Sequence, residues 1–173
     1  AYNPSGKLPV TVPRSVGQVP LYYNYKSTGR PKPKTPNSIF WTHYIDEQNT
    51  PLYPFGHGLS YTTFSYSNLK VSKMSDNEIS VSVDLKNTGN YQGKEVVQLY
   101  IQDVFASITR PVKELKGFEL VALKPEETKT ISFTLTSKEL GFYDNEGNFI
   151  VEPVQISIPV KRLVIEMVIC HSK

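Results

Sequence analysis

The sequence lacks several features on which common classes of protein depend. Its single cysteine, Cys170, excludes a disulfide within the chain and leaves the redox compartment undetermined. No apolar run approaches the ~20 residues that a membrane-spanning helix requires. The chain has no initial methionine and no basic-then-apolar leader, so the signal peptide of an exported protein is expected outside it. We therefore expect a globular chain with no membrane partner.

Motifs for metals, cofactors and catalysis are also missing. The three histidines are scattered, and no His or Cys pair has the spacing of metal ligands. No nucleophile elbow, P-loop or dinucleotide-binding glycine pattern occurs. Three local acid pairs lie in turn-like or linker sequence, where a solvated carboxylate has little reason to be tuned for catalysis: Asp46-Glu47, Glu126-Glu127, and Asp144 with Glu146. We predict no cofactor, no metal site and no catalytic residue in this chain.

Charge is distributed unevenly. The 173 residues carry a net charge of +3 at pH 7, but six of the 19 basic residues precede the first acid, Asp46, leaving 13 bases against 16 acids from there on. Tyrosines are interleaved with those first cations, a combination that also occurs in nucleic-acid binders. Because prolines dilute the charges and no block of one sign forms, we favour a solvated linker docking on a neighbouring domain and predict no nucleic-acid partner.

Prolines determine the character of residues 1–36. They stand at positions 4, 9, 13, 20, 31, 33 and 36, and they exclude a helix interior and most central strand positions. Short alternating runs around Val10 and Leu21 predict extended pieces whose apolar side needs a partner. We predict an extended N-terminal linker arm that, in isolation, is poorly ordered or docked on another surface.

Residues 37–63 form a connecting segment rich in aromatic side chains. A tryptophan near a tyrosine, here Trp41 and Tyr44, can stack on the C–H face of a sugar. The same rings can instead hold a linker against a domain core, and we favour this interpretation. Further on, Gly56 and Gly58 flank a histidine, so the backbone there can adopt positive φ or pass close to other atoms.

From Phe64 onward the hydrophobic period is two. Apolar and polar residues alternate without a fault from Ile79 to Leu85, which predicts a strand with one buried and one solvated face. A change of phase at Ser67-Asn68 predicts a β-bulge. Six or seven short strands with turns between them, and no helical period, predict an all-β antiparallel β-sandwich over residues 64–173.

One strand of this sandwich has two apolar faces. Val97, Leu99 and Ile101 share one face, while Val96 and Tyr100 keep the opposite face partly apolar. We expect the second face to be covered, either by another domain or by a second copy of the chain.

Three motifs occur in order along the chain: Asn3–Pro9, Pro54–Thr62 and Arg110–Phe118. Together they resemble glycoside hydrolase family 3, the β-glucosidase and β-xylosidase family, and this resemblance implies that the sandwich is immunoglobulin/fibronectin type III-like. Asn3–Pro9 matches the end of the family's α/β sandwich domain. Pro54–Thr62 reads PFGHGLSYT and is similar to the family signature PFGxGLSYT. Arg110–Phe118 matches a run in the family's C-terminal fibronectin type III-like domain. The resemblance extends to about Pro153 and is greatest to the bacterial periplasmic β-glucosidases.

The resemblance implies a division of roles. In the family, the nucleophilic aspartate and usually the acid/base glutamate belong to domains upstream of the first motif. This chain is therefore expected to be a non-catalytic C-terminal module that stabilises the domain arrangement of a β-glucosidase-type enzyme, which hydrolyses terminal β-D-glucosyl residues. The catalytic domains are its expected partners and the periplasm or the extracellular space its expected location; an oligosaccharide-binding or homodimerising module stays open. The expected contacts to a sugar or a neighbouring domain are Trp41, Tyr44, Phe55, His57 and Tyr61.

Residues 154–173 depart from the family pattern. Val154, Ile156 and Ile158 can supply a last strand, with Pro159 at an edge or end. The run Leu163–Ile169 is apolar on both faces apart from one glutamate, so it either adds to the sheet or is an aggregation hazard. The departure suggests a shifted reading frame or an unusual terminus, which sequencing of the coding DNA would decide.

Overall fold

The computed structural model describes residues 2–27, 29–30, 32, 40–75, 78–103, 105–152, 155–160 and 163–168, the last two ranges as backbone only. In chain order the elements are η1 (Val16–Gln18), β1 (Phe64–Ser75), β2 (Glu78–Asn87), β3 (Gly93–Asp103), β4 (Glu114–Leu123), β5 (Thr128–Thr136), α1 (Ser137–Leu140), β6 (Phe142–Tyr143), β7 (Phe149–Ile150), β8 (Gln155–Val160) and β9 (Leu163–Val168).

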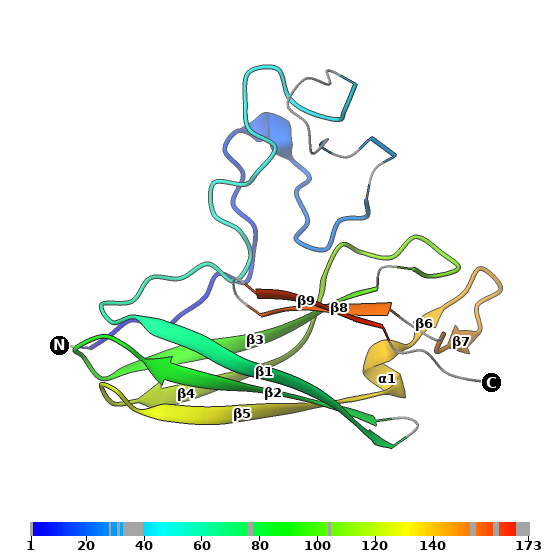
Figure 1. Ribbon diagram of the computed structural model, residues 1–173. Helices are drawn as coiled ribbons and strands as arrows, with labels where there is room; N and C mark the ends of the chain where they lie inside the picture. Colours follow the sequence, from blue (N-terminus) through cyan, green and yellow to red (C-terminus); the bar gives the residue numbers. More distant parts are fainter. Residues whose placement is uncertain are drawn as a thin grey trace.

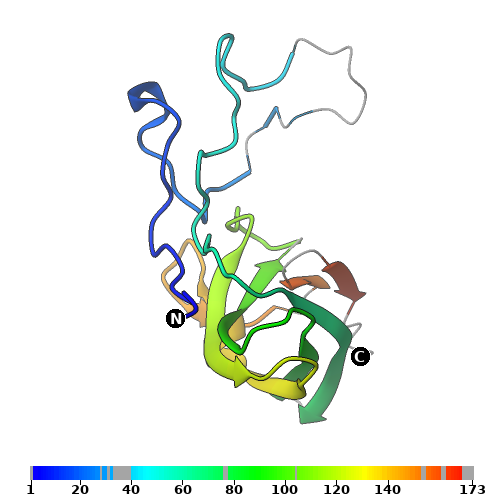
Figure 2. The ribbon, with the colours of Figure 1, turned by 90° about the vertical axis from the view of Figure 1, so that its left-hand side faces the viewer.

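Two antiparallel sheets form the body of the molecule. One sheet has the strand order β1-β2-β5 and the other the order β4-β3-β8-β9, while β6 and β7 form a separate two-stranded ribbon. The two sheets pack against each other; the chain begins beside them, and most of the blue-to-cyan chain before β1 loops away from the sheets and then returns (Figure 1; Figure 2, turned by 90°). The predicted all-β antiparallel sandwich is confirmed.

The core lies between the sheets and consists of the residues that alternate along the strands. The strands of both sheets contribute to it, and its members are 7% exposed or less: Ile79, Val81, Val83, Leu85, Val97, Leu99, Ile101, Val121, Leu123, Ile131 and Leu135. Burial of each such side chain contributes about 1.5–3 kcal/mol. The alternation predicted from Ile79 to Leu85 is therefore the alternation of the buried face of β2.

The predicted bulge in the first strand is present. The register of β1 against β2 shifts between Ser67 and Lys70. Asn68 lies at the shift with φ of 52°, a left-handed conformation that asparagine adopts more readily than most residues. Its side chain donates a 2.8 Å hydrogen bond to Asp84 Oδ2 on β2, which ties the bulge to the neighbouring strand.

One short helical turn follows β5. Residues 137–140 form the single helical turn α1, held at its start by a capping box. Lys138 N donates to Thr136 Oγ1 (3.2 Å), and Thr136 N donates to Glu139 Oε2 (2.8 Å). One turn is too short to show a hydrophobic period in the sequence. The capping residues Thr136 and Glu139 stabilise this turn.

The predicted last strand corresponds to β8. It pairs with β3 at Gln102 and Asp103 and with β9 along its length. Pro159 pairs with Val164 of β9, beyond the short ladder with β3. The backbone of Leu163–Val168 adds to the sheet as β9, which is the first of the two outcomes expected for this run. Val154, Ile169 and the side chains of β8 and β9 lie outside the described residues.

Candidate interdomain clasp and groove

The signature segment pairs with the beginning of the chain. Gly56 N donates to Leu8 O (2.8 Å), and Leu8 N donates in return to His57 O (2.8 Å). Further out, Val12 forms an antiparallel bridge with Tyr53. We call residues 2–12 and 53–63 together the arm base. They form a two-stranded strap where the arm meets the sandwich.

Both glycines of the signature are required by this path. Gly56 has φ of +77°, and a Cβ atom there would meet the side chain of Gln98 and, at 2.9 Å, the hydroxyl of Tyr100. A Cβ on Gly58 would meet the Gly6 carbonyl and, at 2.7 Å, Cδ of Lys7. Gly56 therefore has both features that the sequence raised, positive φ and a close approach of other atoms, whereas Gly58 has the second.

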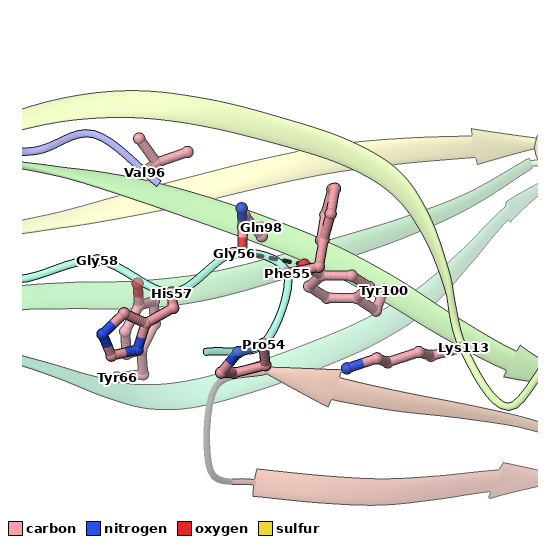
Figure 3. A pocket seen from close by; sticks show the side chains of 10 residues that line it. All are labelled: Pro54, Phe55, Gly56, His57, Gly58, Tyr66, Val96, Gln98, Tyr100 and Lys113. Carbon is pink, nitrogen blue, oxygen red and sulfur yellow. Dashed lines mark hydrogen bonds between the residues drawn. The ribbon is translucent and has the colours of Figure 1, made fainter. Parts of the chain in front are cut away.

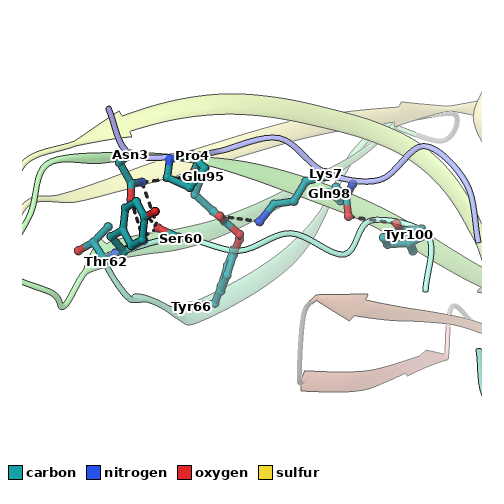
Figure 4. A network of polar contacts seen from close by, with 10 residues as sticks. Asn3, Pro4, Lys7, Ser60, Thr62, Tyr66, Glu95, Gln98 and Tyr100 are labelled. Atoms are coloured by element: carbon teal, nitrogen blue, oxygen red, sulfur yellow. Dashed lines mark hydrogen bonds and ion pairs between the residues drawn. The ribbon is translucent and has the colours of Figure 1, made fainter. Parts of the chain in front are cut away.

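A buried ion pair fastens the arm base to β3 (Figure 4). Lys7 Nζ lies 2.9 Å from Glu95 Oε2, with side chains that are only 7% and 5% exposed. The other oxygen of Glu95 accepts a 3.2 Å hydrogen bond from the Tyr66 hydroxyl of β1. Burial, with the nearby Glu95 carboxylate, raises the pKa of Tyr66. One carboxylate therefore joins the arm base to both sheets.

Amide and hydroxyl groups extend this attachment toward the end of the sandwich. Asn3 Nδ2 donates to Ser60 Oγ (3.0 Å), and Tyr61 N donates to Asn3 Oδ1 (2.8 Å). Next along the chain, Thr62 Oγ1 donates to Oδ1 of the fully buried Asn87 (2.8 Å). We call the following five residues the clasp: Asn3, Lys7, Ser60, Tyr66 and Glu95.

Beside the clasp lies a groove of about 400 Å³ between the signature turn and β3 (Figure 3). Its lining residues are Pro54, Phe55, Gly56, His57, Gly58, Tyr66, Val96, Gln98, Tyr100 and Lys113. The Tyr23 and Phe55 rings stack with centroids 4.2 Å apart, and both meet Tyr100 edge-on at 6.3 and 6.5 Å. The partly apolar face of β3 is thus covered, in part, by the chain's own arm.

Burial shifts the pKa values of two side chains that line the groove, Tyr100 and Lys113. Burial raises the pKa of Tyr100 to about 12. Burial also lowers the pKa of Lys113, whose ammonium lies 5.5 Å from the centroid of the Tyr100 ring. This is the geometry of a cation–π contact, in which a ring face partly replaces the lost hydration of the cation.

The five contact residues expected from the sequence fall into separate places. Phe55 and His57 line the groove. The backbone of Tyr61 joins the clasp, but its ring is 74% exposed. Trp41 and Tyr44 lie in the outer loop of the connecting segment, and Tyr44 N is held there by an asparagine side chain. The structure therefore brings together only the first two.

Sequence reasoning missed Lys7, Glu95 and Lys113. A signal for Glu95 was present, because it stands in phase with Val97 and Leu99 on the buried face of β3. A carboxylate at such a position needs a cation or hydrogen-bond donors. Nothing in the local sequence pointed to Lys7 as that cation.

The local acid pairs organise turns. Asp144 accepts hydrogen bonds from Asn148 N (2.8 Å) and Glu146 N (3.0 Å), and these bonds lower its pKa. Glu127 accepts from Lys124 N (2.7 Å), which lowers the pKa of Glu127 in the same way. Their geometry explains them as turn-stabilising groups.

The described part of the chain contains neither a group of metal-binding side chains nor a membrane-spanning helix. No three His, Cys, Asp or Glu side chains among the described residues are grouped so that they could hold a metal ion. Within the same residues, no helix has the length and apolar character needed to cross a membrane.

Two family models match the chain. Residues 1–61 match the glycosyl hydrolase family 3 C-terminal domain, and residues 95–163 match the fibronectin type III-like domain. The clasp joins these two regions, because Lys7 lies in the first match and Glu95 begins the second.

Proteins with similar sequences and structures bear glycosidase names. A periplasmic β-glucosidase of Salmonella typhimurium is 49% identical over 91% of this chain and 21% of its own length. A β-xylosidase of Formosa agariphila is 42% identical over 91% of this chain and 21% of its own length. The crystal structure of a β-glucosidase from Listeria innocua is 43% identical, with a TM-score of 0.84 over 95% of this chain and 24% of that one.

The chain spans about a fifth of the length of these curated relatives. The resemblance seen in the three sequence motifs is confirmed, and the chain belongs to glycoside hydrolase family 3, with sequence of its C-terminal domain joined to a fibronectin type III-like domain.

Proposed function

We propose that this chain is a non-catalytic module of a β-glucosidase-type enzyme and that it stabilises the arrangement of the enzyme's domains. Hydrolysis of terminal β-D-glucosyl residues would be carried out by carboxylates outside this sequence. Retaining glycosidases need two carboxyl groups roughly 5–5.5 Å apart, one of them protonated. The hydrogen-bonded turn acids Asp144 and Glu127, whose pKa values are lowered, do not suit the protonated role.

The clasp is the observation that carries the proposal. Lys7 and Glu95 are almost completely buried, so separation of the arm base from β3 would leave a charge without its partner. Breaking a buried pair costs roughly 3–5 kcal/mol, far more than breaking an exposed one. We call residues 13–52 the outer arm. Because the arm base is fixed to the sandwich, a domain that binds the outer arm is held in a defined position relative to the sandwich. This is the property that a stiffening module needs.

The outer arm presents apolar side chains that suit a protein partner. Val16 and Ile45 are 89% and 100% exposed, and Phe40 is 77% exposed. Such a set of exposed apolar residues is typical of an interaction surface. We assign them, with Trp41 and Tyr44, to contact with the catalytic domains, and Phe55, His57 and Tyr61 to the junction with the sandwich. Residues 1–36, 37–63 and 64–173 are accordingly the tail of the preceding domain, the connecting segment and the sandwich.

The sugar-binding alternative receives less support from the outer loop. The Trp41 ring stacks on the His43 ring with centroids 4.4 Å apart, and Lys32 Nζ lies 5.8 Å from the Trp41 centroid. Ring faces that are engaged in this way are less available to a sugar. The homodimer alternative would use the Val96 and Tyr100 face, part of which the arm base already covers.

The location that we propose is the periplasm or the extracellular space. The support is the name of the Salmonella relative, a periplasmic β-glucosidase. Fractionation of cells that express the full-length gene would test it, with the protein expected in the periplasmic or culture fraction.

An activity assay tests the non-catalytic role. The purified chain should release no p-nitrophenol from p-nitrophenyl β-D-glucoside, whereas a complete family 3 enzyme assayed in parallel should. Among the described carboxyl groups, burial raises the pKa of Asp103, and the nearby Glu152 raises it further, so these two are the acids to replace. Turnover that co-purifies with the folded chain, and that disappears when Asp103 or Glu152 is replaced, would overturn the proposal. Light scattering on the same sample tests the dimer alternative, because the stiffening role requires no second copy.

A further inference from the structure

Lys113 is the cation at the start of β4 that has no acidic partner among the described residues. Two neighbouring cations share one carboxylate: Arg110 Nη2 lies 2.7 Å from Glu114 Oε2, and Lys116 Nζ lies 3.8 Å from Glu114 Oε1. Lys113 instead extends along the groove toward the signature turn, where the Tyr100 ring is its one recorded contact (Figure 3). A half-buried ammonium in this position retains unused capacity to donate hydrogen bonds.

The amide of Gln98 adds a second donor to the floor of the groove. The Tyr100 hydroxyl donates to Gln98 Oε1 at 3.1 Å, so the amide oxygen is engaged. Gln98 Nε2 has no recorded acceptor among the described residues. Lys113 Nζ and Gln98 Nε2 are thus two donors at the groove, and they suit a ligand that carries hydrogen-bond acceptors.

Sugar hydroxyls and carboxylates differ in what they need from such a groove. A neutral sugar would leave the charge of the Lys113 ammonium without a counter-charge. A carboxylate only accepts, and one ammonium neutralises its single charge. No acid lines the groove.

The remaining walls are apolar and leave room for the body of a small ligand. Phe55 and Pro54 form one side and Val96 part of the floor. A volume of about 400 Å³ lies within the range of small-molecule sites, which combine apolar walls with a few placed polar groups. We propose that this groove is a carboxylate-binding site in which Lys113 pairs with the anion, Gln98 Nε2 donates to it, and Phe55 and Tyr100 pack against the ligand.

Titration of the 173-residue chain, followed by amide and side-chain NMR shifts, tests the proposal. The two carboxylate probes are N-acetylglutamate methylamide, which represents a protein side chain, and D-glucuronate, which represents a sugar acid. N-acetylglutamine methylamide and D-glucose are their neutral counterparts. We expect either carboxylate to shift the Gln98 side-chain amide and the Tyr100 resonances, and the neutral compounds to leave them unchanged. Which of the two carboxylates binds more tightly identifies the source.

Two lysine variants separate the site from general charge. Lys113→Gln should weaken carboxylate binding about tenfold, equivalent to about 1.4 kcal/mol for the lost charge-assisted bond. Lys94→Gln removes an exposed cation from β3 and should leave binding unchanged. Lys113→Arg should retain most of the affinity. Absence of carboxylate-induced shifts, equal shifts with the neutral analogues, or equal losses in both Gln variants would each overturn the proposal.

Discussion

Lys7 Nζ and Glu95 Oε2 lie 2.9 Å apart although 88 positions separate the two residues in the sequence. This contact joins the region that matches the family 3 C-terminal domain to the fibronectin type III-like domain. Around it, Asn3 and Ser60 add neutral hydrogen bonds, and Tyr66 links the same carboxylate to the second sheet. The junction is therefore held mainly by polar groups that water hardly reaches.

Replacement of Lys7 by methionine should destabilise the protein strongly. Glu95 would remain as a buried carboxylate without its cation, so the free energy of unfolding should fall by roughly 3–5 kcal/mol. Urea denaturation measures this change. The matched control is Lys86→Met, because the Lys86–Glu126 pair is 39% and 71% exposed; it should cost less than about 1 kcal/mol. Equal losses in the two variants would contradict the importance of burial.

The signature glycines allow a steric test. Gly58→Ala should lower stability by roughly 1–3 kcal/mol, because the methyl group would press on Lys7 and the Gly6 carbonyl. Gly6→Ala is the matched control, since nothing lies within 4 Å of a Cβ at that position. Its effect should stay within about 0.5 kcal/mol. The thermal unfolding midpoint checks both, and a Gly58→Ala protein as stable as the control would show that the strap can shift.

Asn87 provides an isosteric test of buried polar groups. Its Nδ2 donates to the carbonyls of Tyr91 (2.8 Å) and Leu123 (3.1 Å), and its Oδ1 accepts from Thr62 and Gly89. Asn87→Asp would place an acceptor against two carbonyl oxygens and should cost about 2 kcal/mol or more at neutral pH. Asn90→Asp, at an exposed position three residues away, should be nearly neutral. Denaturant unfolding of the pair at pH 7 distinguishes them.

The capping box of α1 predicts a pH dependence. Hydrogen bonds from the Thr136 side chain and backbone lower the pKa of Glu139. A carboxyl group with a lowered folded-state pKa stabilises the protein fully above its usual pKa of about 4.3, and this stabilisation is lost as the pH falls through the lowered value. Thr136→Val should therefore cost about 1 kcal/mol at pH 7 and less at pH 3. Urea unfolding at both pH values checks this, and a cost that grows on acidification would rule it out.

Trp41 is the only tryptophan, so its fluorescence reports on the outer loop. Because its ring stacks on His43, addition of cellobiose should leave the emission maximum and intensity unchanged if the loop serves protein contact. A saturable change would favour the sugar-binding role. A Trp41→Phe variant, which should show no signal under any condition, confirms that the reporter is this residue.

The sequence alone determined the fold class, the family and several local features. Alternation of apolar and polar residues from Ile79 to Leu85 identifies a half-buried strand because successive side chains of a strand point to opposite faces. The change of phase at Ser67-Asn68 marked the bulge for the same reason. Gly56 and Gly58 were recognisable as positions that need freedom from a Cβ atom. Each of these features depends on residues only a few positions apart.

The tertiary structure alone decided which distant residues meet. The pairing of Lys7 with Glu95, the placement of Lys113 beside Tyr100, and the separation of Trp41 from Phe55 all depend on the route of irregular segments. In such segments proline and glycine restrict local backbone angles, but there is no hydrophobic periodicity from which the path of the chain could be predicted. The partner of a buried charge is therefore determined by packing across the whole domain.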